Sequence, residues 1–220
     1  MSMLDEPTLL ALLSHDRYAV YLARAGHDPA RANRLYVWNI SIAAAFWGGF
    51  HVLEIAVRNA INARLCQVYG VDRWWEVAPL HPSELRRIES AERSAARTHG
   101  PRATSGHVVA ELTFGFWVGL LNNRYHQRLW EAGLSAAFPG VMTTRRELQS
   151  KLERLRKLRN RIAHHEPVIA RDLMLDHVMI LEVLETIDPA AKVWVGAHSR
   201  VPHLLGCRDD VVDGYWPAAF

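Results

Sequence analysis

The sequence predicts an all-α protein, a bundle of helices without a sheet. Its apolar residues recur at the 3.6-residue spacing of helices, and no segment shows the alternation of a half-buried strand. Half of the 220 residues are hydrophobic, which is ample for a core. Proline and glycine fall between the helical segments, so we expect one helical domain over 1–220, with a poorly specified tail at 209–220.

The N-terminal part of the chain is expected to form two helical regions. The first covers 8–25 and stops at Gly26, a residue suited to the turn after a helix. Asp28 and Pro29 then have the character of an N-cap and a first helical residue. The region that they open is expected to extend to Gly70.

The most apolar stretch of the chain lies at 40–57 and carries Gly48-Gly49, His51 and Glu54. These residues predict a bent helix or a helix pair inside the protein, and we expect no membrane span. The first residues lack the basic and apolar regions of a secretory signal, so a cytoplasmic protein is expected. Two cysteines, Cys66 and Cys207, form no disulfide framework and no zinc-knuckle spacing.

The middle of the chain begins with an expected loop at 72–82 that contains Trp74 and Trp75. The two indoles either fill the core beneath the loop, which we favour, or form a platform for stacking nucleic-acid bases. A polar, arginine-rich and exposed helix is predicted at 83–98. Helix is expected to resume near His107 and to continue through 111–117 and 120–121.

Further helices are predicted at 144–165, 170–187 and 189–197. Thr144 and Glu147 have the T-x-x-E spacing of a capping box, in which each side chain satisfies a backbone N–H near the other residue. One apolar stripe follows on this helix: Leu148, Leu152, Leu155 and Ile162. Because Pro167 disfavours helix at the residue before it, the helix is expected to end at 164–166.

The helix predicted at 144–165 is strongly basic although the net charge of the chain is only +3. From 145 to 161 eight basic residues stand against two acidic ones. A solvated helix face is one interpretation, but the position of the run favours binding of a polyanion such as RNA. The expected RNA-binding residues are Arg154, Arg156, Lys157 and Arg161.

The same helix ends in the segment 159–167, which gathers Arg159, Asn160, His164 and His165. A guanidinium, an amide and imidazoles are groups able to cut RNA without a metal ion or cofactor. The spacing Arg-x4-His alone says little, because it recurs at Arg102…His107 in a stretch rich in turn-forming residues.

The position of Arg159 is unusual because it lies about 20° from Leu148, inside the apolar stripe. Glu54 lies similarly close to the centre of an apolar stripe on the helical region after Asp28. The economical solution is that the two faces pack together and Glu54 orients Arg159, since an unpaired buried charge is costly. Arg58 competes for Glu54 through an i,i+4 pair, and a purely structural ion pair is an open alternative.

An ideal helix places His164 about 140° from Arg159, off the apolar stripe. His164 therefore faces solvent or a second subunit, unless the helix distorts before Pro167. Asn160 lies one turn earlier on the same side and is able to hydrogen-bond the ring or a phosphate. His165 points elsewhere, and a surface or capping role is an equal alternative to a functional one.

Three blocks of the sequence resemble the Abi-like (abortive infection) proteins of the HEPN superfamily. They are Leu53-Glu54-x3-Arg58-Asn59, Phe114-Gly115-Phe116-Trp117 and Leu158-Arg159-Asn160-x3-His164-His165. Their order and separation also fit, so the resemblance covers about 34–194, and Arg-Asn-x3-His is similar to the superfamily's Arg-x4-6-His signature.

The resemblance implies a helical bundle of HEPN type with additional helices, usually a homodimer, that cuts RNA without metal in phage defence or as a toxin. By the same resemblance Arg159 and His164 are the catalytic pair and Asn160 is their polar companion. Glu54, Arg58 and Asn59 are then the supporting set. The family also contains members that bind RNA or partners without demonstrated cleavage.

Cleavage by the RNA's own 2′-hydroxyl needs a base, an acid and positive charge at the phosphorane. One chain offers one convincing histidine, so a two-fold dimer that joins both motifs is expected in preference to recruitment of His165. The rival function is a non-catalytic module that binds RNA or a protein, with an antitoxin protein or RNA as a possible partner. A metal site at His164-His165-Glu166 is disfavoured, because adjacent residues diverge on a helix and no second ligand cluster is present.

Overall fold

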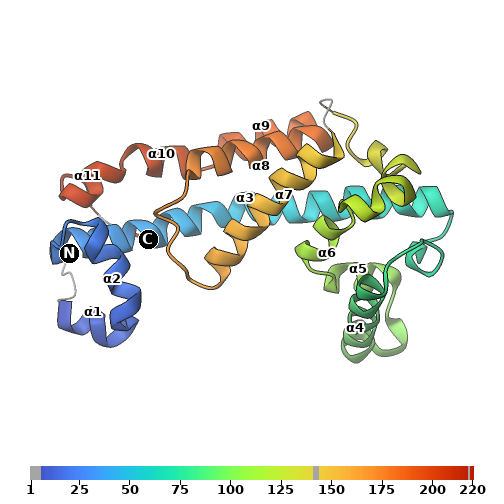
Figure 1. Ribbon diagram of the computed structural model, residues 1–220, viewed down its shortest axis with the longest axis horizontal. Helices are drawn as coiled ribbons and strands as arrows, with labels where there is room; N and C mark the ends of the chain where they lie inside the picture. Colours follow the sequence, from blue (N-terminus) through green and yellow to red (C-terminus); the bar gives the residue numbers. More distant parts are fainter. Residues whose placement is uncertain (1–5, 141–143, 218) are drawn as a thin grey trace. The chain divides into compact units, whose positions relative to one another are not determined.

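The computed structural model describes residues 6–140, 144–217 and 219–220. Within these ranges every regular element is helical and no strand is found, so the predicted all-α fold is confirmed (Figure 1). The chain divides into two compact units. Unit 1 comprises 1–50, 158–178 and 197–220, and unit 2 comprises 51–157 and 179–196. The single domain over 1–220 stays a prediction, because both units take residues from the same helices: α3 (Pro29–Tyr69), α7 (Arg145–Ala163), α8 (Leu173–Ile187) and α9 (Pro189–His198).

The N-terminal helices α1 (Glu6–Leu13) and α2 (His15–Arg24) belong to unit 1. The single helix predicted over 8–25 is therefore wrong. It is interrupted at Ser14, whose φ of 68° and ψ of 152° are incompatible with a continuous helix. Gly26 follows with a φ of 67°, so the predicted stop there is confirmed.

Helix α3 (Pro29–Tyr69) begins where the sequence predicted. The Asp28 carboxylate accepts hydrogen bonds from the backbone N–H groups of Ala30 and Arg31 at 2.8 and 3.1 Å, which is the geometry of an N-cap. The helix continues without interruption through Gly48-Gly49, where a bend was expected. One stripe of α3 is almost completely buried: Leu35, Trp38, Ile42, Phe46, Phe50, Leu53, Val57, Ile61 and Leu65.

By length and composition alone α3 is able to cross a membrane, and it is the only such helix in the described part of the chain. The core helix of a soluble protein passes the same test.

The C-terminal segment packs against the first part of α3 within unit 1. It forms α10 (Val201–Gly206) and α11 (Arg208–Asp213), so helical structure reaches into the tail that no sequence pattern specified. The indole Nε1 of Trp38 donates to the carbonyl of Leu204 at 2.8 Å, and Nε of Arg34 donates to that of Val212 at 2.7 Å.

The loop after α3, in unit 2, holds a short 3-10 helix at Trp74–Glu76. Both indoles are buried, with exposures of 0 % for Trp74 and 3 % for Trp75. Trp74 donates to the Asn62 side chain at 2.9 Å, and Trp75 donates to Glu92 at 3.2 Å. The core interpretation is confirmed, and the base-stacking platform is wrong because neither ring face is accessible.

Helix α4 (Pro82–His99) packs against α5 (Ser105–Glu111) in unit 2, and Figure 1 shows the two side by side. Most of α4 is exposed as predicted, but the prediction is wrong for one face, which buries Glu84, Ile88, Ala91 and Ala95. The continuous helix expected from His107 to Leu121 is also wrong. It breaks at Leu112 and Thr113, whose extended backbone separates α5 from α6 (Phe114–Gly119).

Short helical turns follow α6: η3 (Asn123–Tyr125), η4 (His126–Glu131) and η5 (Leu134–Ala137). The capping box of α7 (Arg145–Ala163) is confirmed. The backbone N–H of Glu147 donates to Thr144 Oγ1 at 3.2 Å, and the N–H of Thr144 donates to the Glu147 carboxylate at 3.0 Å.

The remaining helices are α8 (Leu173–Ile187) and α9 (Pro189–His198), close to the predicted ranges. The start of α8 comes three residues later than predicted. Asp172 accepts a hydrogen bond from the N–H of Leu175 at 2.9 Å, as an N-cap does.

Candidate functional site

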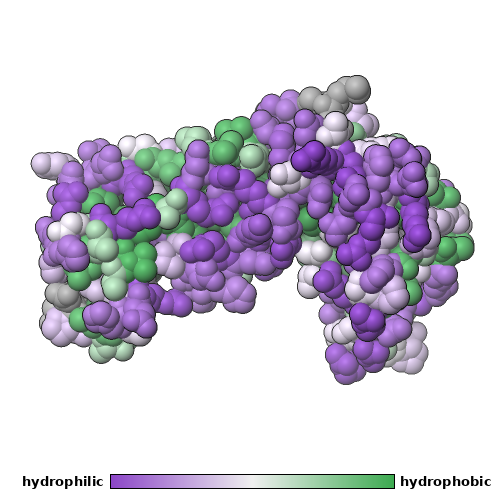
Figure 2. Space-filling view, in the orientation of Figure 1, coloured by the Kyte–Doolittle hydropathy of each residue, from purple (hydrophilic) through white to green (hydrophobic). Residues whose placement is uncertain are grey.

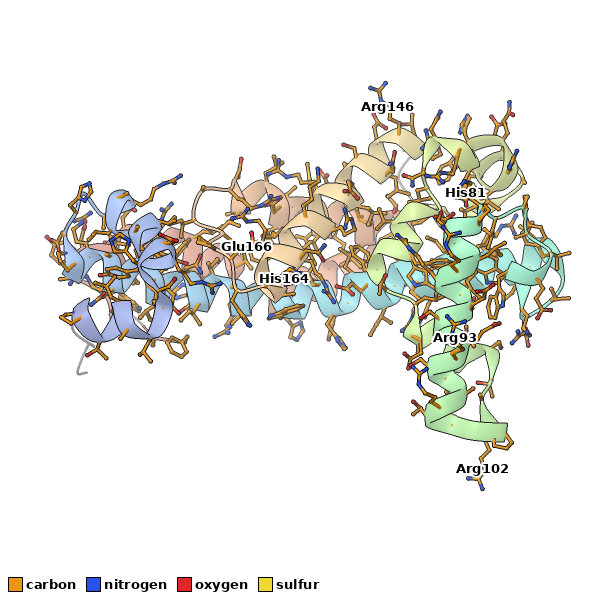
Figure 3. The ribbon with its side chains drawn as sticks, turned by 60° about the horizontal axis from the view of Figure 1, so that its bottom comes forward. His81, Arg93, Arg102, Arg146, His164 and Glu166 are labelled. Atoms are coloured by element: carbon orange, nitrogen blue, oxygen red, sulfur yellow. The ribbon has the colours of Figure 1, made fainter. Side chains whose placement is uncertain are left out.

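The C-terminal end of α7, in unit 1, carries Arg159 and Asn160, and His164, which Figure 3 labels, follows directly after the helix. Its last turn closes with two bonds, from the N–H of His165 to the carbonyl of Ile162 at 3.0 Å and from that of Glu166 to Arg161 at 2.8 Å. His165 has a φ of 57°. This is the Schellman arrangement, in which the residue after the helix is left-handed. The helix thus ends at Ala163, one residue before the predicted range of 164–166, and His165 occupies a capping position.

Arg159 is half-buried and lies beside an aromatic ring that the sequence reasoning missed. Its guanidinium carbon is 5.5 Å from the centre of the Trp47 ring, a cation–π contact within unit 1. Trp47 is 40 % exposed. The sequence feature that could have identified Trp47 is its spacing on α3. Trp47 precedes Glu54 by seven residues and therefore lies on the same helical face.

The predicted supporting residues Glu54, Arg58 and Asn59 lie on α3 in unit 2. Glu54 is half-buried, less so than its place near the apolar stripe suggested. Nε of Arg58 donates to Oδ1 of Asn59 at 3.1 Å in an exposed position. The pairing of Glu54 with Arg159 stays a prediction, since the two residues belong to different units.

His164 is exposed, as its helical angle predicted. Its backbone N–H donates to the carbonyl of Asn160 at 2.9 Å, which continues the helical pattern by one residue. Its ring makes no hydrogen bond or ion pair within the described part of the chain. Asn160 is half-buried. The ring of His164 is therefore accessible for proton transfer to a bound molecule.

His165 takes part in the packing of unit 1 through its backbone. Its carbonyl accepts a hydrogen bond from Arg17 of α2 at 3.0 Å. A pocket of about 390 Å³ lies beside it in unit 1, lined by Tyr36, Asn39 and Trp47 of α3 among others. Asn39 is buried and accepts from the N–H of Val168 at 2.9 Å, so it anchors the segment that follows the helix.

The four expected RNA-binding residues differ in how far their side chains already interact with other groups of the protein. Arg156 is held by Glu153 through two hydrogen bonds of 2.8 and 2.7 Å, which raise the pKa of Arg156 and lower the pKa of Glu153. Arg161 pairs with Glu166 at 3.3 Å and donates to the carbonyl of Pro167. Lys157 is exposed, whereas Arg154 is half-buried and has an interaction within the chain. The basic run is therefore partly neutralised by the protein itself.

Arg145, at the start of the basic run, is a structural residue. It is buried, donates to the carbonyl of Leu121 and donates to Oδ1 of Asn123 at 3.0 Å. A guanidinium that satisfies backbone and amide oxygens in this way is not available to RNA.

The second Arg-x4-His pair, Arg102…His107, has a local role in unit 2. Nδ1 of His107 accepts from the N–H of Thr104 at 3.1 Å and closes the cap of α5. The ring of His107 also stacks on that of His99, with the ring centres 3.7 Å apart. Arg102 lies at the tip of the α4–α5 pair (Figure 3).

Among the described residues, no group of three or more His, Cys, Asp or Glu side chains is arranged to hold a metal ion. No family model matches the chain, and neither a curated protein nor a solved structure is detectably similar to it. The resemblance to Abi-like proteins therefore rests on the sequence blocks alone and stays a prediction.

Proposed function

We propose that this chain is a metal-independent endoribonuclease of toxin or phage-defence type, of the HEPN superfamily. It acts in the cytoplasm as a homodimer. The observation that carries the proposal is the end of α7, where an exposed imidazole follows a guanidinium and an amide within six residues. His164 is accessible, and Arg159 is held over Trp47.

The reaction needs no group from outside the protein and the RNA. The 2′-oxygen attacks the adjacent phosphorus while a base removes its proton, so that a 2′-O–P bond forms. The P–O5′ bond breaks, and an acid protonates the leaving 5′-oxygen. Histidine serves either role near neutral pH, and Arg159 stabilises the negative charge on the phosphorane. The products carry 2′,3′-cyclic phosphate and 5′-hydroxyl ends.

Helix geometry is the reason for proposing a dimer. Over five residues a helix advances about 7.5 Å and turns by about 140°, so Arg159 and His164 of one chain diverge. Both His164 and His165 are exposed, but His165 has the left-handed backbone that ends the helix, so we count His164 as the one imidazole that each chain supplies. A two-fold axis that brings two copies together supplies a base, an acid and two guanidinium groups at one phosphate.

Cleavage of mixed RNA by the purified protein in EDTA tests the proposal. We expect fragments with 2′,3′-cyclic phosphate ends, and we expect His164→Ala and Arg159→Ala each to lower the rate by at least 100-fold, since general acid–base catalysis contributes about 10²–10⁴. Arg102→Ala and His107→Ala are the matched controls, because they remove the other pair with the same spacing. Activity that vanishes in EDTA and returns with a divalent ion would contradict the proposal.

The alternative is a non-catalytic HEPN module that binds RNA or a protein such as an antitoxin. Its support is that Arg156 and Arg161 are already paired with carboxylates, which weakens the segment as an RNA-binding surface and favours a protein partner. RNA that is bound but never cut, with binding unaffected by His164→Ala, favours this alternative.

Mass measurement in solution tests the shared site separately. A strictly monomeric protein that still cuts RNA, or a dimer with its two His164 rings on opposite outer faces, rules out the shared site while leaving the ribonuclease proposal open.

A further inference from the structure

Unit 2 contains a cavity of about 930 Å³ that none of the predicted catalytic residues lines. One wall is a face of α4, and the others are α6, the turn at η3 and the middle of α7. Its lining is polar, and on the face shown in Figure 2 the region of α4 and α5 is covered mostly by hydrophilic side chains. Cavities that hold small molecules have volumes of roughly 300–1,000 Å³, so this one is large enough for a nucleotide.

Three arginines line the cavity: Arg87 and Arg97 on α4, and Arg124 on η3, whose charge also acts on the Glu84 carboxylate. Within the described ranges none of them makes a hydrogen bond or an ion pair. Each guanidinium carries five N–H donors in a planar fork that matches phosphate and carboxylate oxygens. Three guanidinium groups around one cavity point to a ligand with more than one anionic group.

The fourth arginine of the lining is Arg156, which Glu153 holds in a fixed position. Against these four guanidinium groups the lining carries three carboxylates, those of Glu84, Glu111 and Glu153, so positive charge is in excess in the cavity.

Neutral polar groups complete the lining. Gln149 of α7 donates to Asn122 at 2.8 Å, which leaves the Asn122 amide nitrogen with donor capacity toward the cavity. Ser90 and Ser94 present hydroxyl groups from α4. A bare polyanion would leave these amides and hydroxyls unused, whereas a sugar and a base engage them.

A buried carboxylate forms part of the same wall. Glu84 is 4 % exposed and accepts hydrogen bonds from Tyr125 at 2.7 Å and from Ser83 at 3.0 Å. These bonds fix the start of α4, the helix that carries Arg87 and Arg97. The arginines therefore project from a rigid element, which lowers the entropy cost of binding.

We propose that this cavity binds a nucleotide, with Arg87, Arg97 and Arg124 on its phosphate groups and the amides on its base or sugar. The nucleotide is either part of an RNA strand or a free nucleoside triphosphate. In the first case the site extends the substrate contacts of the proposed ribonuclease and rests on that function. In the second case it is an effector site and stands independently of it.

Binding to the full-length His164→Ala protein tests the proposal, because that variant is expected not to degrade the probe. The probes are a fluorescein-labelled 12-nucleotide single-stranded RNA, followed by anisotropy, and ATP, followed by calorimetry. Arg87→Ala/Arg97→Ala is compared with Arg86→Ala/Arg93→Ala. The second pair removes the same charge from the same helix outside the cavity lining.

We expect the cavity double variant to weaken binding of one probe by at least tenfold and the control double variant to stay within twofold. If the probe is RNA, the slope of log K against log salt falls in magnitude by about 1.4 for two lost phosphate contacts. Tight binding of RNA alone identifies a strand as the ligand, and tight binding of ATP identifies a free nucleotide.

Equal effects of the two double variants overturn the proposal, and so does failure of both probes to bind the parent protein. Inorganic tripolyphosphate that binds as tightly as ATP overturns the nucleotide assignment. Melting curves of both double variants confirm that the helix is intact. Because binding is measured without cleavage, failure of the ribonuclease proposal is seen separately, in the cleavage assay.

Discussion

The hydroxyl of Tyr125 joins the start of α4 to the η3 turn. It donates to the Glu84 carboxylate at 2.7 Å and accepts from the backbone N–H of His81 at 3.0 Å. Tyr125 is 1 % exposed, and its burial together with the bond to Glu84 raises the pKa of Tyr125 to about 12. The hydroxyl therefore keeps its proton at any pH at which the protein is handled, and Tyr125→Phe removes one donor and one acceptor.

The expected cost of Tyr125→Phe is about 2–3 kcal/mol in the free energy of unfolding. A hydrogen bond to a charged group contributes about 1.5–3 kcal/mol, and the Glu84 carboxylate is too deeply buried for water to replace it fully. The N–H of His81 lies in an exposed segment, so its lost acceptor adds little. For a protein of this size the cost corresponds to a fall in Tm of roughly 5–10 °C.

The cost should depend on pH. Burial alone raises the pKa of Glu84, but hydrogen bonds from Tyr125 and Ser83 and the charge of Arg124 outweigh it, so the net pKa is lowered. A carboxyl with a lowered pKa adds stability above its unfolded value of about 4.3 and loses it as the pH falls through the folded value. The difference between wild type and Tyr125→Phe is therefore largest near pH 7 and narrows below about pH 4.

Urea denaturation at pH 7 and at steps down to about pH 3 measures both effects. Tyr69→Phe is the matched control, since Tyr69 is a half-buried tyrosine of unit 2 and its hydroxyl makes no hydrogen bond within the described residues. That variant should stay within about 0.5 kcal/mol of wild type. A Tyr125→Phe cost no larger than that of Tyr69→Phe, or a cost that does not change with pH, would refute the reasoning.

Two further predictions concern the backbone. Gly140→Ala should lower the free energy of unfolding by more than about 2 kcal/mol, because a Cβ there would overlap the backbone carbonyl of Glu185. Gly206→Ala, where the Cβ meets open space, should change it little. Equal melting temperatures of the two variants would contradict this prediction. His165→Gly should leave the free energy of unfolding within about 0.5 kcal/mol of wild type. Glycine relieves the strain of a left-handed residue, about 1 kcal/mol, but it also raises the conformational entropy of the unfolded chain, and the two effects offset each other. His165→Val should lower the melting temperature, and a rise would argue against the left-handed cap.

The sequence predicted those elements whose signals are local. The Asp28 cap and the Thr144–Glu147 box both depend on residues within one turn of the helix start, and both are confirmed. The breaks at Ser14 and at Leu112–Thr113 were missed, because nothing in the neighbouring residues forbids helix there. Such breaks are imposed by packing, which a helical period does not encode.

The candidate site was predictable in its residues and less so in its surroundings. The end of α7 and the exposure of His164 follow from Pro167 and from helical geometry, both readable from the sequence. Trp47 and Asn39 were not found, since they contact Arg159 of α7 and Val168 after it, positions more than 100 residues away in the sequence. Only the tertiary structure reveals which arginine faces an aromatic ring and which faces a carboxylate.

The two Arg-x4-His pairs demonstrate why spacing alone does not define a site. In Arg102…His107 the histidine closes a helix cap and stacks on His99, so its nearer ring nitrogen is already used. In Arg159…His164 the capping role passes to the next residue, His165, whose left-handed backbone ends the helix and leaves the ring of His164 in solvent. Because His165 ends the helix in the second pair, the ring of His164 stays available, whereas the ring of His107 is occupied by the cap of its own helix. In the proposed RNA cleavage one imidazole supplies only half of the proton transfers, and the proposed dimer would supply the other half from the second copy of the same helix end.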